Sequence, residues 1–93
     1  MRVALTARFR IELPEKSAAS SLALLDADGN ELAIVTERAG ARSYYERVPA
    51  QIASALICTA DDRATTLVIY GADGEIHRMP IQLTPDDLTV FRP

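Results

Sequence analysis

Arginine and tyrosine are the residue types in this sequence best suited to binding a partner. Guanidinium groups pair with carboxylates and phosphates, and both residue types are enriched where proteins contact one another. Two stretches hold them: an N-terminal segment in which Arg alternates with apolar residues, and a central segment in which Arg flanks the tripeptide SYY. The candidate protein-interface residues are Arg2, Arg8, Arg10, Arg38, Arg42, Tyr44, Tyr45 and Arg47.

These residues allow three interpretations. The simplest is a solvated surface, because Glu12, Glu37 and Glu46 can neutralise neighbouring Arg side chains. The others are an interface with a carboxylate-rich protein and an interface with the phosphates of nucleic acid. The formal charge is −3, with residues 1–47 neutral and residues 48–93 carrying three basic and six acidic side chains. A nucleic-acid binder is typically strongly basic, so we expect a protein partner instead.

The remaining reactive residues form no recognisable catalytic or metal-binding motif. His77 is the only histidine and Cys58 the only cysteine, and the chain has no CxxC pair, GxSxG motif or glycine-rich phosphate loop. Cys58 stands among apolar residues, so we expect a buried cysteine, and we expect His77 at the surface of a strand. The sequence therefore predicts a non-enzymatic protein with no cofactor and no metal.

The tripeptide Ala-Asp-Gly occurs twice, at residues 27–29 and 72–74. The first copy lies in DADGNE, whose carboxylate and amide oxygens are ligands that calcium prefers. With Gly29 at the sixth position of an EF-hand loop, however, Leu24 and Val35 would occupy the first and twelfth positions. Neither side chain can bind calcium, so the motif indicates a turn.

The first copy also predicts a strand register. A three-residue loop with Gly29 in the left-handed conformation would pair Leu24 with Leu32. The same register would pair Leu22 with Ile34. It gathers four large aliphatic side chains on one face, which favours it over a two-residue loop.

Residues 1–13 alternate between apolar and polar side chains, and this is the strongest secondary-structure signal in the chain. The pattern predicts one long strand, ended by Pro14, with a buried apolar face and an exposed face that carries Arg. A long strand exposes an unpaired edge unless something covers it. Pairing of that edge about a two-fold axis would give a homodimer.

Residues 50–60 are ambiguous. Apolar residues recur there at helical spacings, Ala is frequent, and Pro49 suits a first helical turn, so we favour a helix from Pro49 to Ala60. A strand remains the alternative, because a period-2 pattern also places four residues on one side: Ile52, Ser54, Leu56 and Cys58.

The remaining segments complete an α+β pattern. Strands are expected at Ser21–Asp26, Glu31–Thr36, Thr65–Tyr70, Glu75–Leu83 and Leu88–Phe91, with a loop over residues 37–43. Pro80 indicates an edge strand or a bulge. The sequence thus predicts one small domain spanning 1–93: an antiparallel sheet of about five to six strands with two hairpins and one helix packed on a face. An all-β sandwich is the alternative if residues 50–60 form a strand.

Composition indicates where such a protein works. A single cysteine cannot form an internal disulfide, the N-terminus has no uninterrupted apolar segment, and no stretch approaches a membrane span. We therefore expect a cytoplasmic protein. Nine of the ten basic residues are Arg and fifteen residues are Ala, which indicates a bacterial or phage source.

No family is recognised from these motifs, so function is inferred from the residues alone. We expect a small protein-binding module of accessory, regulatory, inhibitor or immunity type, acting singly or as a homodimer. One alternative is a nucleic-acid-binding regulator that uses the Arg-bearing strand and the central segment. Another is a small-molecule-binding protein or enzyme with a cavity around His77 and Tyr70.

Overall fold

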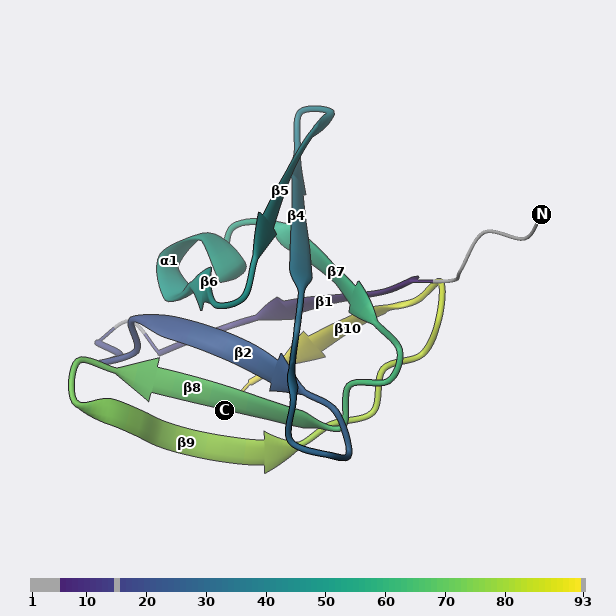
Figure 1. The fold of residues 1–93 in the computed structure, drawn as a ribbon. Coiled ribbons are helices and arrows are strands. Elements are labelled where there is room, and N and C mark those ends of the chain that lie inside the picture. Colours follow the sequence, from purple (N-terminus) through teal and green to yellow (C-terminus); the bar gives the residue numbers. More distant parts are fainter. Residues whose placement is uncertain (1–5, 15, 93) are drawn as a thin grey trace.

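The computed structural model describes residues 6–14 and 16–92, which form two five-stranded sheets and one short helix (Figure 1). The strands are β1 (Thr6–Ile11), β2 (Ser21–Leu25), β3 (Glu31–Leu32), β4 (Ile34–Arg38), β5 (Ala41–Tyr45), β6 (Val48–Pro49), β7 (Ile57–Asp61), β8 (Thr66–Gly71), β9 (Gly74–Pro80) and β10 (Leu88–Phe91), and the helix is α1 (Ala50–Ala53). The first sheet has the order β10-β1-β7-β4-β5. The second has the order β3-β2-β8-β9, with β6 also paired to β2. All neighbouring strands are antiparallel except β1 and β10.

The core lies between the two sheets. Phe9 and Ile34 project into it from the first sheet, and Leu24 and Leu67 project from the second, all fully buried. Full burial of each such side chain contributes roughly 1.5–3 kcal/mol. The expected alternation of β1 is confirmed in its described part, because Ala7, Phe9 and Ile11 are buried while Arg8 is exposed.

One long hairpin belongs to both sheets. The chain leaves the second sheet at Ala33, runs through β4 and β5 in the first sheet, and returns to the second at β6. β3 and β6 therefore share the same edge of β2. Ala39 and Gly40 form the turn between β4 and β5, with φ values of 51° and 81°. The turn end of this hairpin projects from the body of the molecule (Figure 1).

The first Ala-Asp-Gly turn has the expected three-residue loop. Leu24 pairs with Leu32, and Gly29 has a φ of 84°. The Asp26 carboxylate accepts hydrogen bonds from the backbone N–H groups of Asp28 and Asn30, each at 2.9 Å. These bonds lower the pKa of Asp26, and the bond from the Asn30 N–H contributes most. They also hold the loop in its conformation.

The expected pairing of Leu22 with Ile34 is wrong. Leu22 pairs instead with Val48, because the chain bends at Ala33 and carries Ile34 into the first sheet. Both side chains are nevertheless fully buried in the common core. The turn therefore sets the register only as far as Leu32.

The second Ala-Asp-Gly sequence forms a different turn. Gly71 pairs with Gly74, which leaves a two-residue loop with Gly74 at the start of β9. The two copies are thus not a structural repeat. Pro80 ends β9, which is an edge strand, and a bulge interrupts its pairing with β8. The edge position agrees with the sequence-based expectation for this proline, whereas the bulge lies at Ile69 and Tyr70, away from it.

The predicted helix over Pro49–Ala60 is wrong for most of its length. Only Ala50–Ala53 is helical, and Ile57–Asp61 is β7. The side chain of Ser54, at the helix C-terminus, lies 3.3 Å from the Gln51 carbonyl, and such back-bonding competes with helix continuation. β7 is bonded to strands on both sides, which outweighs the weak intrinsic stability of a twelve-residue helix.

The fold class is confirmed at its coarser level: the described chain is mostly antiparallel β-sheet with one short helix. The expected five to six strands and two hairpins were too few. Residues 37–43, expected to be a loop, mostly belong to β4 and β5, since only Ala39 and Gly40 form the turn. β1 is not an edge, because β10 and β7 flank it, so the expected dimer through its edge loses its basis.

Gly29→Val tests the first turn. Nothing lies within 4 Å of a Cβ built at Gly29, so only the left-handed backbone conformation opposes the substitution. We expect a loss of about 1–2 kcal/mol of unfolding free energy. The melting temperature would fall by about 4 °C or more. Ala27 lies in the same exposed loop but has a negative φ, so Ala27→Val should leave the melting temperature nearly unchanged. Equal melting temperatures for both variants would contradict this assignment.

Ala39→Asn tests the hairpin turn. A turn with positive φ at both central residues favours Asn-Gly, whereas alanine is strained there. We expect a gain of about 0.5 kcal/mol in unfolding free energy, measured by urea denaturation. Ala41→Asn, next to the turn but in extended β5, should not stabilise the protein. A lower denaturation midpoint for Ala39→Asn would exclude this turn type.

Candidate functional site

The outer face of the first sheet brings one side chain from each of its five strands into a single row. Arg8 of β1 pairs with Leu88 on one side and with Thr59 on the other. Val35 of β4 pairs with Thr59 and with Tyr44 of β5. Residues opposite one another on neighbouring strands point to the same face. The row is therefore Leu88, Arg8, Thr59, Val35 and Tyr44.

Further cross-strand pairs lie beside this row. Arg10 pairs with Val90, and Glu37 pairs with both Ile57 and Arg42. We call the surface formed by both sets the Arg–Tyr face. Its residues are Arg8, Arg10, Val35, Glu37, Arg42, Tyr44, Ile57, Thr59, Leu88 and Val90. The structure thus unites two candidate segments about 30 residues apart in sequence.

Exposed apolar side chains are concentrated on the Arg–Tyr face. Tyr44 is 70% exposed, Leu88 47% and Ile57 41%. Among the described residues they are three of the four exposed large hydrophobic side chains; the fourth, Ile76, is on β9 in the other sheet. Exposed apolar residues grouped with Arg and Tyr are typical of protein–protein interfaces.

The guanidinium groups of this face are only weakly engaged. Arg42 lies 3.6 Å from Glu37, and Arg10 lies 3.4 Å from Glu12, which also binds Arg92 at 2.9 Å. Exposed pairs of this kind contribute about 0–1 kcal/mol.

Two further observations concern the Arg side chains of β1. Arg8 makes no ion pair with any residue that the structure describes, and Arg10 Nε is buried without a hydrogen-bond partner in that part of the chain. The exposed Arg8 guanidinium can therefore meet carboxylates of a partner at little cost, whereas the buried Arg10 Nε cannot.

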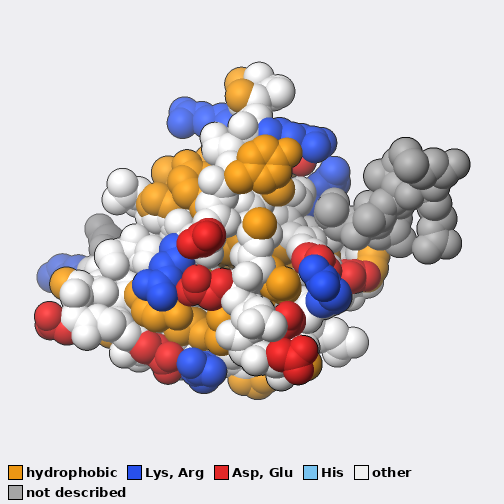
Figure 2. All heavy atoms as spheres, viewed as in Figure 1, with side chains coloured by type: hydrophobic (Ala, Val, Ile, Leu, Met, Phe, Trp, Pro, Cys, Tyr) orange, Lys and Arg blue, Asp and Glu red, His pale blue; other side chains and the backbone are white. Residues whose placement is uncertain are grey.

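The other candidate residues lie elsewhere. Arg38 is exposed at the hairpin turn. It follows Glu37 directly on β4, so its side chain points to the opposite face of the sheet. Tyr45 is partly buried and packs against the core. Arg47 lies in the bend just before β6 of the other sheet. Arg2 lies outside the described residues. In Figure 2, Lys and Arg side chains flank the tip of the projecting hairpin, where Arg38 and Arg42 are exposed.

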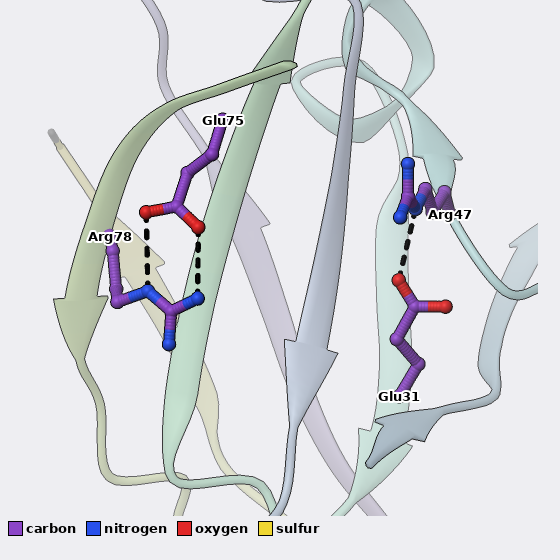
Figure 3. Close-up of polar contacts among 4 residues, drawn as sticks. All are labelled: Glu31, Arg47, Glu75 and Arg78. Atoms are coloured by element: carbon purple, nitrogen blue, oxygen red, sulfur yellow. Dashed lines mark hydrogen bonds and ion pairs between the residues drawn. The ribbon is translucent and has the colours of Figure 1, made fainter. Parts of the chain in front are cut away.

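The outer face of the second sheet has a different character, because its charges are paired. Arg47 Nε donates to Glu31 at 2.9 Å, and its guanidinium lies over the Tyr70 ring, 3.9 Å from the centroid. Arg78 donates two hydrogen bonds to Glu75, at 2.8 and 3.2 Å (Figure 3). They lower the pKa of Glu75 and raise that of Arg78. Acidic and basic side chains are interspersed on the side shown in Figure 2.

Two surface hollows bear on the hypothesis of a cavity around His77 and Tyr70, and neither includes both residues. An open hollow of about 180 Å³ includes His77 but not Tyr70, which lies under Arg47 instead. Its lining residues are Leu13, Pro14, Ser17, Ile69, Ile76 and His77. A second hollow of about 370 Å³ is lined by Leu13, Pro14, Ser17, Ala19, Ala50, Gln51 and Ser54. Within residues 6–14 and 16–92, no three His, Cys, Asp or Glu side chains are grouped to hold a metal ion.

Sequence reasoning missed the apolar members of the Arg–Tyr face. Ile57 falls within the range of the predicted helix, so its place on a sheet face is not anticipated. Leu88 and Val90 join the face through the parallel pairing of β10 with β1. That pairing connects opposite ends of the chain, and no local pattern reveals it.

Comparison with known proteins identifies no relative: no family model matches the chain, and no curated protein or solved structure is significantly similar to it. None of the helical residues described forms a segment long and apolar enough to cross a membrane. Function must therefore be argued from the chain's own residues.

Cys58 lies in the core, as expected, and its chemistry can be tested. It is fully buried in β7, and burial raises the pKa of its thiol to about 11. We expect negligible labelling by iodoacetamide at pH 8 in the native protein and complete labelling in denaturant. The denatured sample is the control for reagent activity. Rapid stoichiometric labelling of the native protein would contradict a buried thiol.

Proposed function

We propose that this chain is a non-enzymatic protein-binding module that contacts its partner through the Arg–Tyr face. The observation that carries the proposal is the cross-strand row, which places exposed Tyr44 and Leu88 on the same surface as Arg8. An accessory, regulatory, inhibitor or immunity role uses such a surface. The buried free thiol of Cys58 supports a reducing, cytoplasmic location.

The chemistry of the face defines its partner. Apolar side chains release water when they are covered, at roughly 25 cal/mol per Å². Arg8 and Arg42 add directional donors for carboxylates, and Arg42 can exchange its long contact with Glu37 for a shorter one. The complementary surface is therefore apolar at its centre and bears carboxylates.

Substitutions on the face test the proposal. Tagged protein would be used to capture partners from a lysate of the source organism, and captured proteins would be quantified. We expect Tyr44→Ala and Arg8→Glu each to reduce capture of the specific partner at least about 5-fold, the effect of losing about 1 kcal/mol.

Matched controls separate the face from general surface effects. Ile76→Ala removes an exposed apolar side chain from the other sheet, and Lys16→Glu makes the same charge change as Arg8→Glu in a loop. Both controls should capture the partner as the wild type does. Equal capture by all four variants would exclude the Arg–Tyr face as the binding surface.

The same variants distinguish a nucleic-acid target. Binding through phosphates weakens steeply as salt rises. Arg8→Glu would then abolish retention on DNA at low salt, whereas Tyr44→Ala would change it less. We expect no such retention, because the chain carries −3 overall and is not the strongly basic protein that phosphate binding favours.

A further inference from the structure

The edges of the two sheets are protected to different degrees. Unpaired strand edges invite pairing with another chain unless Pro, bulges, charges or short length prevent it. β9 has Pro80 and a bulge, and β6 has Pro49 and only two residues, like β3. β10 has four residues between Asp87 and Arg92. β5 has five residues, ARSYY, with no Pro and no bulge; its pairing with β4 is regular, and Arg42 is its one charged residue.

The backbone of β5 has donors and acceptors available at this edge. The two-residue turn makes Arg38 and Ala41 the closing hydrogen-bonded pair of the hairpin. Hydrogen-bonded pairs alternate along an antiparallel ladder, so Ser43 and Tyr45 also point their backbone groups toward β4. The N–H and C=O groups of Arg42 and Tyr44 therefore point away from β4, toward the open edge.

We propose that β5 pairs with β5 of a second copy of this chain, antiparallel and about a two-fold axis at Ser43. In this register Arg42 of each copy lies opposite Tyr44 of the other, and Ala41 lies opposite Tyr45. Each Arg42–Tyr44 pair exchanges its free backbone hydrogen bonds. The two first sheets become one continuous sheet, and two Arg–Tyr faces join side by side.

The side chains of β5 complement themselves in this arrangement. The Arg42 side chain is 63% exposed and Tyr44 is 70% exposed, so both are available at the edge. A guanidinium beside a tyrosine ring forms a cation–π contact, as Arg47 does on Tyr70 within this chain. A two-fold axis at Tyr44 would instead extend the pairing past Tyr45 into the bend at Glu46. The axis at Ser43 keeps every paired residue within β5.

The projecting position of the hairpin leaves room for a second copy. Figure 1 shows the turn end of β4 and β5 standing clear of the rest of the molecule. This dimer forms through the edge of the sheet, whereas the proposed function uses the Arg–Tyr face, so the dimer goes beyond the proposed function. It replaces the dimer expected through β1, which lies inside the sheet.

The first test is the mass of the full chain in solution across a concentration series, by analytical ultracentrifugation. We expect a concentration-dependent dimer of the 10.1 kDa chain. Arg42→Glu removes the cation–π partner and should weaken dimerisation at least about 5-fold. Arg38→Glu makes the same charge change on the same hairpin, but on β4, and should leave the dimer intact.

Tyr44→Pro tests the backbone contribution. Proline removes an N–H that faces the open edge, and edge strands accept proline at such positions. The variant should be monomeric with its circular dichroism spectrum unchanged. A wild type that is monomeric at its highest soluble concentration overturns the inference, as does a dimer that Arg42→Glu leaves intact. Either result would overturn the dimer and leave the proposed binding function standing, because that function is tested separately by capture of the partner.

Cross-linking tests the register even if a variant fails to fold. Ser43 of each copy would form a non-hydrogen-bonded pair with Cα atoms about 4.5 Å apart, which suits a disulfide. Ser43→Cys should cross-link into a dimer on mild oxidation, whereas Ala41→Cys, opposite Tyr45, should not. Buried Cys58 does not compete. Cross-linking of Ala41→Cys but not of Ser43→Cys would overturn the proposed register.

Discussion

The pairing of β7 with β1 on one side and β4 on the other is the interaction on which the rest of the structure depends. It joins the N-terminal strand to the long central hairpin, and it places Cys58 beside both Phe9 and Thr36 at the centre of the first sheet. The small side chains of Cys58 and Ala60 fill the inner face. On the outer face, Thr59 Oγ1 donates to the Val35 carbonyl at 3.3 Å and holds the middle of the cross-strand row.

The two outer faces of the molecule are chemically different, and this difference carries the functional argument. On the second sheet, Arg47 and Arg78 are held by short hydrogen bonds to carboxylates, and Arg47 also covers Tyr70. On the Arg–Tyr face, Arg10 and Arg42 make longer contacts of 3.4 and 3.6 Å with carboxylates, and the largest exposed apolar side chains remain uncovered. A surface that satisfies its own charges has less to gain from a partner than one that does not.

Local patterns predicted the features that depend on neighbouring residues. The alternation of Ala7, Phe9 and Ile11 gave the buried face of β1, and Gly29 marked a three-residue turn, because both follow from backbone geometry within a few residues. The same reasoning failed at residues 54–60. Helical spacing and high Ala content are local preferences, and hydrogen bonding to two partner strands overrides them.

The sequence by itself therefore determined which residues are buried in the described part of β1, where the two Ala-Asp-Gly turns lie and which Arg and Tyr residues are candidates for binding. Only the tertiary structure decided that Arg8 and Arg10 share a face with Arg42 and Tyr44, and that Arg47 does not. The physical reason is that a face of a sheet is defined by register between strands distant in sequence. That register is set by shared burial and long-range hydrogen bonding, which no short segment encodes.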